Sequence, residues 1–241
     1  PDAVVKTSLV KQSLQIKLLN ISLRNYQEKI INEWKETKPT EGCFALSMAS
    51  GKTIMALQII KELGLTATIL VPTNVILEQF KAEAKKHWNY DLGVINGDEK
   101  NIKEVTVANI ASLFNNSDLL KELVDNTSVL ITDEAHLFVS DKRELVIEQF
   151  KPSYIYGLSG TFDREDGQAE AIHFYFGNII AEYEADMVKP TVEVIDSQEN
   201  IPVCLNYAEM IDKMIENKSR NTLIMGVALG EAMEGRKVLV L

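Results

Sequence analysis

The sequence is poor in the residues that build disulfide frameworks, zinc sites and membrane spans. Its 241 residues include two cysteines, Cys43 and Cys204, and three histidines. The cysteines are far apart and lie in apolar surroundings, so we expect buried free thiols in a reducing, cytoplasmic compartment. No apolar stretch approaches the roughly 20 residues that a membrane-spanning helix needs, and the N-terminus lacks the charged-then-apolar pattern of a signal peptide. These absences predict an intracellular chain without a membrane partner.

Positive charge is also scarce. The 25 lysines and arginines face 35 aspartates and glutamates, which gives a formal net charge of −10. This balance argues against a protein that binds nucleic acid by broad electrostatic attraction. It is compatible with a protein that holds phosphates locally, through backbone amides and a few lysines. The hydrophobic content of 46% is that of an ordinary globular chain.

Short apolar runs alternate with amphipathic stretches in the first two thirds of the sequence. Helical spacing is seen over 55–63 and 74–88. Continuous apolar runs predict strands at 44–46, 67–71, 93–95, 105–108, 128–132 and 154–158. Strands that alternate with helices predict an α/β fold, with a parallel sheet covered by helices on both faces. Active sites of such sheets lie at the carboxyl ends of the strands.

The pattern changes after Thr161. Further strands are expected at 178–183 and 191–195, helices at 207–215 and 221–233, and the start of a buried strand at 237–241. A strand needs a partner, so we expect a truncated second domain that continues beyond Leu241. The predicted domain limits are an unassigned N-terminal extension (1–20), a first domain (21–187), and a linker with the start of a second domain (188–241).

A phosphate-binding turn is predicted between the strand at 44–46 and the following helix. Such a turn needs backbone N–H groups at a helix N-terminus, where the helix dipole favours anions. A glycine permits close approach, a lysine reaches the β- and γ-phosphates, and a threonine hydroxyl can ligate Mg²⁺. Leu46 replaces the first glycine of the usual pattern, and Ala49 stands where a glycine is often found. A Gly-Lys-Thr triplet also occurs by chance, but its position here favours function. The predicted residues are Ala49, Ser50, Gly51, Lys52 and Thr53.

An acidic pair ends the strand predicted at 128–132, in the run Asp-Glu-Ala-His of residues 133–136. Asp133 would hold magnesium, and Glu134 would orient or deprotonate an attacking water. A strand-terminal acidic pair in solvent is the alternative. That alternative is common for one pair, but it does not account for the Gly-Lys-Thr turn about eighty residues earlier.

Together these segments resemble superfamily 2 helicases and translocases of the DEAH type. The resemblance implies a RecA-like P-loop NTPase domain that uses ATP and Mg²⁺ and acts on nucleic acid, with DNA favoured over RNA. Residues 23–27 (Leu-Arg-Asn-Tyr-Gln) resemble the family's nucleotide-binding segment, so Arg24 and Gln27 are expected at the nucleotide, with Gln27 on the adenine edge. His136 would belong to the catalytic set and couple two domains. The catalytic residues implied are Lys52, Asp133, Glu134 and His136, and the metal ligands are Thr53 and Asp133.

Further segments match in the family's order. Residues 71–73 with Gln79 resemble motif Ia, which lies along the nucleic-acid backbone. Residues 157–161 resemble motif III, which links nucleotide state to the nucleic-acid surface. Residues 164–166 resemble the Arg-Glu-Asp element of the XPB-like branch, which includes phage recombination helicases of the UvsW type. The residues expected to contact nucleic acid or couple to it are Pro72, Thr73, Gln79, Ser159, Thr161, Arg164, Glu165 and Asp166.

One further segment matches its family motif less well, and the role of a second segment has two possible interpretations. The next strand-contacting motif, expected over residues 106–113, has Asn109 and Ala111 where the family has Thr and Gln. Lys81, Lys85 and Lys86 form a basic helix face that either contacts phosphate or is simply solvated.

The resemblance implies an ATP-dependent DNA helicase or translocase, in repair, recombination or replication. The isolated chain is expected to hydrolyse ATP slowly, because the second domain normally supplies the arginines that stabilise the transferring phosphate. Two alternatives stay open. One is a subunit that translocates on duplex DNA in a restriction or remodelling complex, and the other is a catalytically inactive ATPase-like scaffold.

Overall fold

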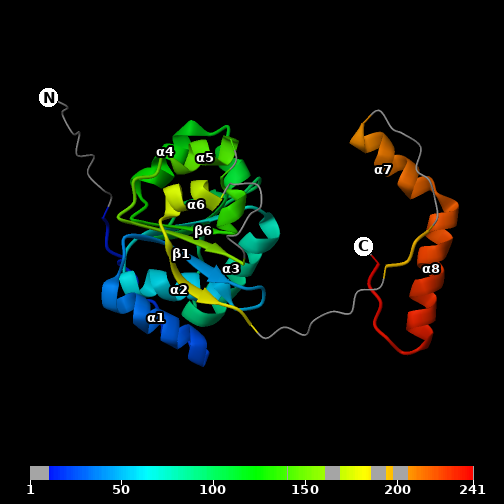
Figure 1. Cartoon of the computed structure of the whole chain (residues 1–241). Helices are drawn as coiled ribbons and strands as arrows, with labels where there is room; N and C mark the ends of the chain where they lie inside the picture. The colour runs from blue at the N-terminus through cyan, green and yellow to red at the C-terminus, as the bar shows by residue number, and fades with distance from the viewer. Residues whose placement is uncertain (1–10, 140, 161–168, 186–193, 198–205, 241) are drawn as a thin grey trace. The chain divides into compact units, whose positions relative to one another are not determined.

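The computed structural model describes residues 11–139, 141–160, 169–185, 194–197 and 206–240. The chain divides into two compact units, residues 1–186 and residues 187–241 (Figure 1). This division falls one residue from the predicted limit of the first domain. The identity of the second unit as the start of a second RecA-like domain stays a prediction.

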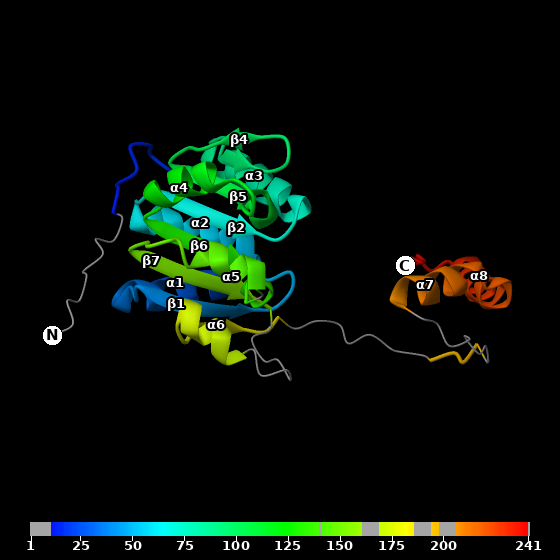
Figure 2. The same ribbon diagram turned by 90° about the horizontal axis from the view of Figure 1, so that it is seen from above.

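The first unit is built on one sheet of eight strands in the order β4-β3-β5-β2-β6-β7-β1-β8 (Figure 2). Neighbouring strands are parallel except β3 and β4. The strands are β1 (Glu41–Leu46), β2 (Ala67–Val71), β3 (Gly93–Ile95), β4 (Lys100–Asn101), β5 (Val105–Asn109), β6 (Val129–Asp133), β7 (Tyr154–Ser159) and β8 (Ile179–Tyr183). The predicted sheet is confirmed, and β4 is an addition that the sequence did not indicate.

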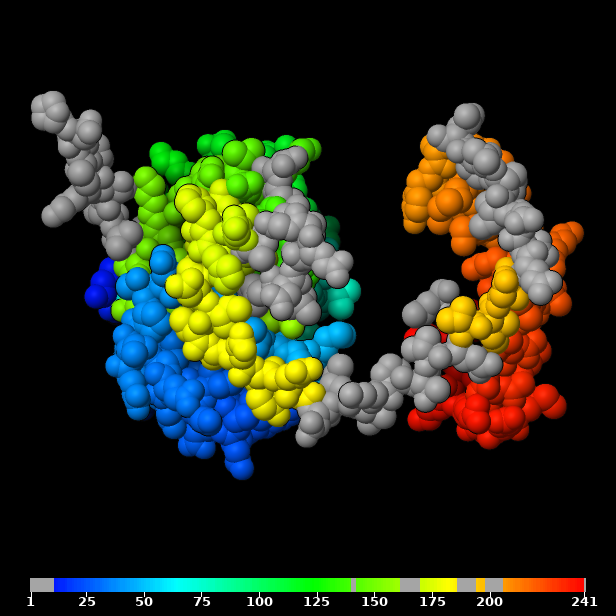
Figure 3. All heavy atoms as spheres, viewed as in Figure 1, coloured from blue at the N-terminus to red at the C-terminus, as the bar shows by residue number. Residues whose placement is uncertain are grey.

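Helices cover both faces of this sheet, as predicted. One buried cluster packs the first three helices on the sheet, and a second cluster packs the next three on the opposite face. Figure 3 shows α6 (Ala169–Phe176) and β8, in yellow, lying across the surface beside α1 (Asn25–Thr37) and β1, in blue. The helices are α1 (Asn25–Thr37), α2 (Lys52–Leu63), α3 (Asn74–Trp88), α4 (Ser117–Asp125), α5 (Asp141–Ile147) and α6 (Ala169–Phe176).

The N-terminal extension is partly attached to the sheet. Ser13 forms an antiparallel bridge with Leu65, and the amide N of Thr66 donates to the carbonyl O of Gln12 at 2.8 Å. The amide N of Gln12 in turn donates to Oγ of Ser128 at 2.6 Å. Residues 12–14 therefore cross the amino ends of β2 and β6, a contact that no sequence pattern indicated.

The second unit contains α7 (Tyr207–Glu216) and α8 (Lys218–Met233), which confirm the two predicted helices. The strand predicted at 237–241 is wrong for residues 237–240, which are irregular. A strand requires a hydrogen-bonded neighbour, and the described part of this unit contains none. Of the strand predicted at 191–195, residues 194 and 195 are also irregular, and the rest lie outside the described residues.

Two smaller expectations concern cysteine and membranes. Cys43 is fully buried in β1, as predicted, whereas Cys204 lies outside the described residues. None of the helices that the structure describes is both long enough and apolar enough to cross a membrane.

Candidate active site

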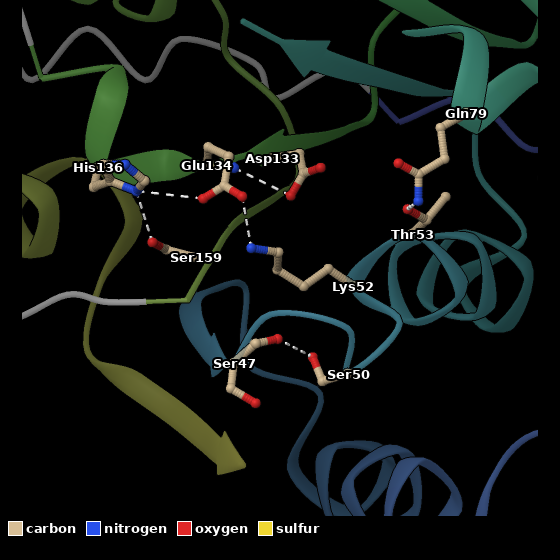
Figure 4. Close-up of polar contacts among 9 residues, drawn as sticks. All are labelled: Ser47, Ser50, Lys52, Thr53, Gln79, Asp133, Glu134, His136 and Ser159. Carbon is tan, nitrogen blue, oxygen red and sulfur yellow. Dashed lines mark hydrogen bonds and ion pairs between the residues drawn. The ribbon is translucent and has the colours of Figure 1, made fainter. Parts of the chain in front are cut away.

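The predicted turn and the predicted acidic pair meet at the carboxyl end of the sheet (Figure 4). The turn follows β1 and leads into α2, whereas the acids end β6, two strands away across β7. Nζ of Lys52 lies 2.7 Å from Oε1 of Glu134, and the side chains are 12% and 26% exposed. Residues 82 positions apart in sequence therefore form one partly buried ion pair.

The turn has an unusual backbone. Gly51 has φ +79°, which glycine adopts freely, and a Cβ built on it would lie 2.6 Å from Nε2 of Gln27. Ala49 has φ +61°, a left-handed conformation that costs a residue with a Cβ about 1–2 kcal/mol. Oγ of Ser50 donates to the carbonyl O of Ser47 at 2.6 Å and closes the turn. The glycine often found at position 49 would thus remove a strain that this chain carries.

Side chains at the start of α1 hold this turn by its carbonyl groups. Nε2 of Gln27 donates to the carbonyl O of Ser50 at 3.0 Å, and the Tyr26 hydroxyl donates to the same oxygen. Nη1 of Arg24 lies 3.4 Å from the carbonyl O of Ala49. Gln27 is only 3% exposed, so its amide is placed beneath the turn. The predicted contact of Gln27 with an adenine edge stays a prediction.

Sequence reasoning missed two residues that support the same turn. The rings of Tyr26 and Tyr183 stack with their centroids 3.7 Å apart and an angle of 2° between the planes. The amide N of Ser47 donates to the carbonyl O of Tyr183 at 3.0 Å, and Oγ of Ser47 accepts from the amide N of Ala185 at 2.9 Å. Tyr26 stands within the Leu-Arg-Asn-Tyr-Gln segment and could have been noticed. No local pattern marks Tyr183, because its position depends on β8 pairing with β1.

The two acids differ in environment. Asp133 is 4% exposed, and its burial raises the pKa of the carboxyl to about 6, with Lys52 opposing this rise and Glu134 adding to it. Oδ1 of Asp133 accepts a hydrogen bond from the amide N of Glu134 at 3.1 Å. Glu134 has φ +56°, a left-handed conformation in which backbone strain is stored. Strain and a perturbed pKa of this kind cluster at functional sites.

A histidine and a serine connect this pair to β7. Nδ1 of His136 lies 2.8 Å from Oγ of Ser159 and 3.5 Å from Oε2 of Glu134. Two of the predicted coupling residues thus lie directly beside the acids. A Cβ on Gly160 would lie 3.8 Å from Nζ of Lys52, an ordinary contact, so this glycine also borders the site. The predicted coupling residues Thr161, Arg164, Glu165 and Asp166 lie outside the described residues.

The segment expected along nucleic acid occupies the start of α3. Oγ1 of Thr73 accepts from the amide N of Ile76 and caps the helix. Asn74 and Asn109 are joined by a 2.7 Å hydrogen bond between their side chains, across the carboxyl ends of β2 and β5. Gln79 points toward the turn, and its Nε2 donates to Oγ1 of Thr53 at 3.1 Å (Figure 4).

The three lysines of α3 are all ion-paired. Their side chains contact acids within the same helix or in the neighbouring loops, which favours the solvated alternative over phosphate contact. The pairs are Lys81 with Glu78 at 2.9 Å, Lys85 with Asp91 at 2.9 Å and Lys86 with Glu83 at 3.5 Å.

The donor set fits Mg²⁺ held together with a phosphate. No group of three or more His, Cys, Asp or Glu that could hold a metal by itself occurs in the described residues. Mg²⁺ is usually bound by one or two carboxylates, waters and substrate phosphates. The carboxylate of Asp133 and the hydroxyl of Thr53 at one end of the sheet match that requirement.

Residues 20–164 match the family described as the type III restriction enzyme, res subunit. The chain belongs to this family. The match confirms the resemblance to superfamily 2 helicases and translocases that the motifs indicated.

The relatives of this chain include proteins that are named as helicases and translocases. The DNA 3'-5' translocase XPB2 of Sulfurisphaera tokodaii is 31% identical over 66% of this chain and 35% of its own length. The probable helicase D10 of Escherichia phage T5 is 27% identical over 79% of this chain and 42% of its own length. The chain therefore spans less than half the length of these curated relatives.

Solved structures confirm the fold. The UvsW helicase of bacteriophage T4 superposes with a TM-score of 0.56 at 16% identity, over 71% of this chain and 69% of that one. The Sulfolobus solfataricus SWI2/SNF2 ATPase core in complex with dsDNA gives 0.55 at 22% identity, over 69% of this chain and 38% of that one. At these identities the likeness concerns the architecture alone.

Proposed function

We propose that this chain is the nucleotide-hydrolysing part of an ATP-dependent motor that moves on DNA. The observation that carries the proposal is the meeting of Lys52, Asp133 and Glu134 at one end of the sheet, with Lys52 and Glu134 in a 2.7 Å ion pair. A lysine-bearing turn at a helix N-terminus beside two strand-terminal acids is an arrangement that supports phosphoryl transfer from a nucleoside triphosphate.

Each residue has a definite task in this proposal. The backbone N–H groups at the start of α2 and the Lys52 ammonium donate to phosphate oxygens. Thr53 and Asp133 hold Mg²⁺, which when bound neutralises charge on the phosphoryl oxygens. Glu134 orients a water and accepts its proton as the water attacks. Lys52 must loosen its ion pair to reach a phosphate, and this leaves Glu134 available to the water.

DNA is proposed as the nucleic acid on which the motor moves, because two relatives are named as a DNA translocase and a DNA helicase.

A second RecA-like domain beyond Leu241 is part of the proposal, supported by relatives that are more than twice as long as the matched region. Arginines from such a domain contribute about 10³–10⁵ in rate in comparable enzymes. We therefore expect the 241-residue chain to bind ATP·Mg weakly and hydrolyse it slowly. A cytoplasmic location is also proposed, supported by the buried thiol of Cys43.

Movement on duplex DNA without strand separation is a second candidate. The description of the family as a restriction enzyme subunit favours it. A strand-displacement assay beside a triplex-displacement assay, on protein that carries both RecA-like domains, separates the two candidates. Triplex displacement without strand displacement would establish translocation alone.

An inactive scaffold is the remaining alternative, and nucleotide binding tests it. A fluorescent ATP analogue should bind the 241-residue chain more tightly with Mg²⁺ than with EDTA. Absence of binding under both conditions would favour the scaffold. ATP turnover near one per second by this chain alone would contradict the proposed dependence on a second domain, because it reaches the low end for kinases.

A further inference from the structure

Gln79, in α3, contacts Thr53, one of the two proposed Mg²⁺ ligands. Its Nε2 donates to Oγ1 of Thr53 at 3.1 Å, while Thr53 itself is 4% exposed at the start of α2. Figure 4 shows the amide directed at the threonine hydroxyl, on the side of Thr53 away from Lys52. Family resemblance alone would place Gln79 along nucleic acid. Its observed partner is instead the hydroxyl expected to ligate Mg²⁺.

The hydrogen bond from Gln79 affects how the Thr53 hydroxyl can bind a metal ion. A threonine oxygen has one proton and two lone pairs, and its side chain in a helix divides between two rotamers. A hydrogen bond from Gln79 occupies one lone pair and selects one rotamer. The second lone pair is then left for a cation, and the proton is left for a neighbouring oxygen. The contact therefore prepares Thr53 as a metal ligand without contacting the metal.

We propose that Gln79 is a positioning residue that holds the Thr53 hydroxyl in the orientation that ligates Mg²⁺. This inference rests on the proposed nucleotide-binding function. Gln79 lies on the same helix as the capping Thr73, and Asn74 ties the start of that helix to the end of β5. The position of Thr53 is therefore fixed by a helix that is itself anchored at its first turn.

The test is a Mg²⁺ titration of the 241-residue chain with a fixed concentration of fluorescent ATP analogue. Gln79→Met keeps a similar length without polar atoms, and Gln79→Ala removes the side chain. Both should raise the Mg²⁺ concentration for half-maximal binding about two- to tenfold, the effect of losing one hydrogen bond. Affinity for the analogue in EDTA should not change. A wild-type midpoint in both variants, or an equal loss of affinity with and without Mg²⁺, would overturn the inference.

The matched control is Gln149→Ala. Nε2 of Gln149 donates to the carbonyl O of Leu145 in its own segment at 3.1 Å, and the side chain is exposed. This variant should titrate with Mg²⁺ as the wild type does. Circular dichroism melts of all variants check that the fold is intact, which the exposed position of Gln79 predicts.

A double-mutant cycle isolates the contact. In a Thr53→Val background the hydroxyl is gone, so adding Gln79→Met should not shift the Mg²⁺ midpoint further. Additive shifts would show that Gln79 acts by another route, and they would count against the inference. If the wild type bound no nucleotide at any Mg²⁺ concentration, the proposed function itself would fail. If it bound normally and only the Gln79 effect were missing, the failure would belong to this inference alone.

Discussion

The two ends of the sheet in the first unit carry opposite kinds of polar residues. At the carboxyl end, charged side chains crowd together on strained backbone, with Glu134 and Ala49 both in the left-handed region. At the amino end, neutral hydroxyls pair with one another. Thr66 Oγ1 lies 2.9 Å from Ser128 Oγ, and Thr68 Oγ1 lies 2.7 Å from Thr127 Oγ1. We call these four residues the amino-end hydroxyl cluster.

The amino end of the sheet therefore contributes to stability, whereas the carboxyl end carries the candidate active site. The amino-end hydroxyl cluster satisfies buried polar groups and fastens the N-terminal residues, which is what a stabilising network does. The carboxyl end buries a carboxylate and stores backbone strain, which lowers stability and is tolerated at functional sites. Substitutions at the two ends should therefore move binding and stability independently.

The largest expected effect is on nucleotide binding at the carboxyl end. Lys52→Ala should weaken binding of a fluorescent ATP analogue by about ten- to a hundredfold, because charge-assisted hydrogen bonds to phosphate are lost. Glu134→Gln should bind the analogue as the wild type does and stop ATP turnover in protein with both RecA-like domains. Loss of binding in Glu134→Gln would instead make Glu134 a structural residue.

Asp133→Asn should change the pH dependence of stability. The pKa of Asp133 is raised from its ordinary value of 3.8 to about 6, so the folded state binds more protons than the unfolded state between these values. The contribution of Asp133 to the free energy of unfolding should therefore fall as pH rises from about 4 through the folded pKa of about 6, by about 2–3 kcal/mol in all, and level off about one pH unit above that pKa. Asp133→Asn should lack this component. Urea unfolding at pH 4.5, 5.5 and 6.5 measures it, and identical slopes in the two proteins would refute the raised pKa.

At the amino end, Ser128→Ala should lower stability and leave nucleotide binding unchanged. The hydroxyl accepts from the amide N of Gln12 and contacts Thr66, so its removal leaves buried polar groups unsatisfied at a cost of about 1–3 kcal/mol. Chemical denaturation measures the loss. Ser22→Ala, at an exposed position, is the matched control and should change stability by less than about 0.5 kcal/mol. Weaker nucleotide binding in Ser128→Ala would show that the two ends are coupled.

The smallest effect is expected from Ala49→Gly. Relief of the left-handed strain should outweigh the added freedom of the unfolded chain and stabilise the protein by up to about 1 kcal/mol. Ala45→Gly makes the same change within β1, where it should destabilise by about 0.5–1 kcal/mol. A higher melting temperature for Ala49→Gly and a lower one for Ala45→Gly would support strain in the turn. A lower melting temperature for both variants would argue against it.

Local patterns were sufficient to predict most elements of the first unit. Continuous apolar runs gave the central strands, and helical spacing gave α2 and α3, because burial repeats with the period of each structure. The same reasoning did not predict α1, α4, α5 or α6, although in α4 Leu120 and Leu123 have helical spacing and are buried. It placed a strand at 237–241 because apolar residues there suggest burial, but a strand also needs a partner from elsewhere in the chain.

The site shows the same division. By themselves, the residues determined that a lysine-bearing turn and an acidic pair end two strands, because glycine conformation, helix N-termini and strand ends are local properties. Tertiary structure alone decided that Lys52 meets Glu134, that Gln27 supports the turn and that Gln79 holds Thr53. It also decided the raised pKa of Asp133. These features depend on strand order and on how completely each group is buried, and both are set by contacts between segments far apart in the sequence.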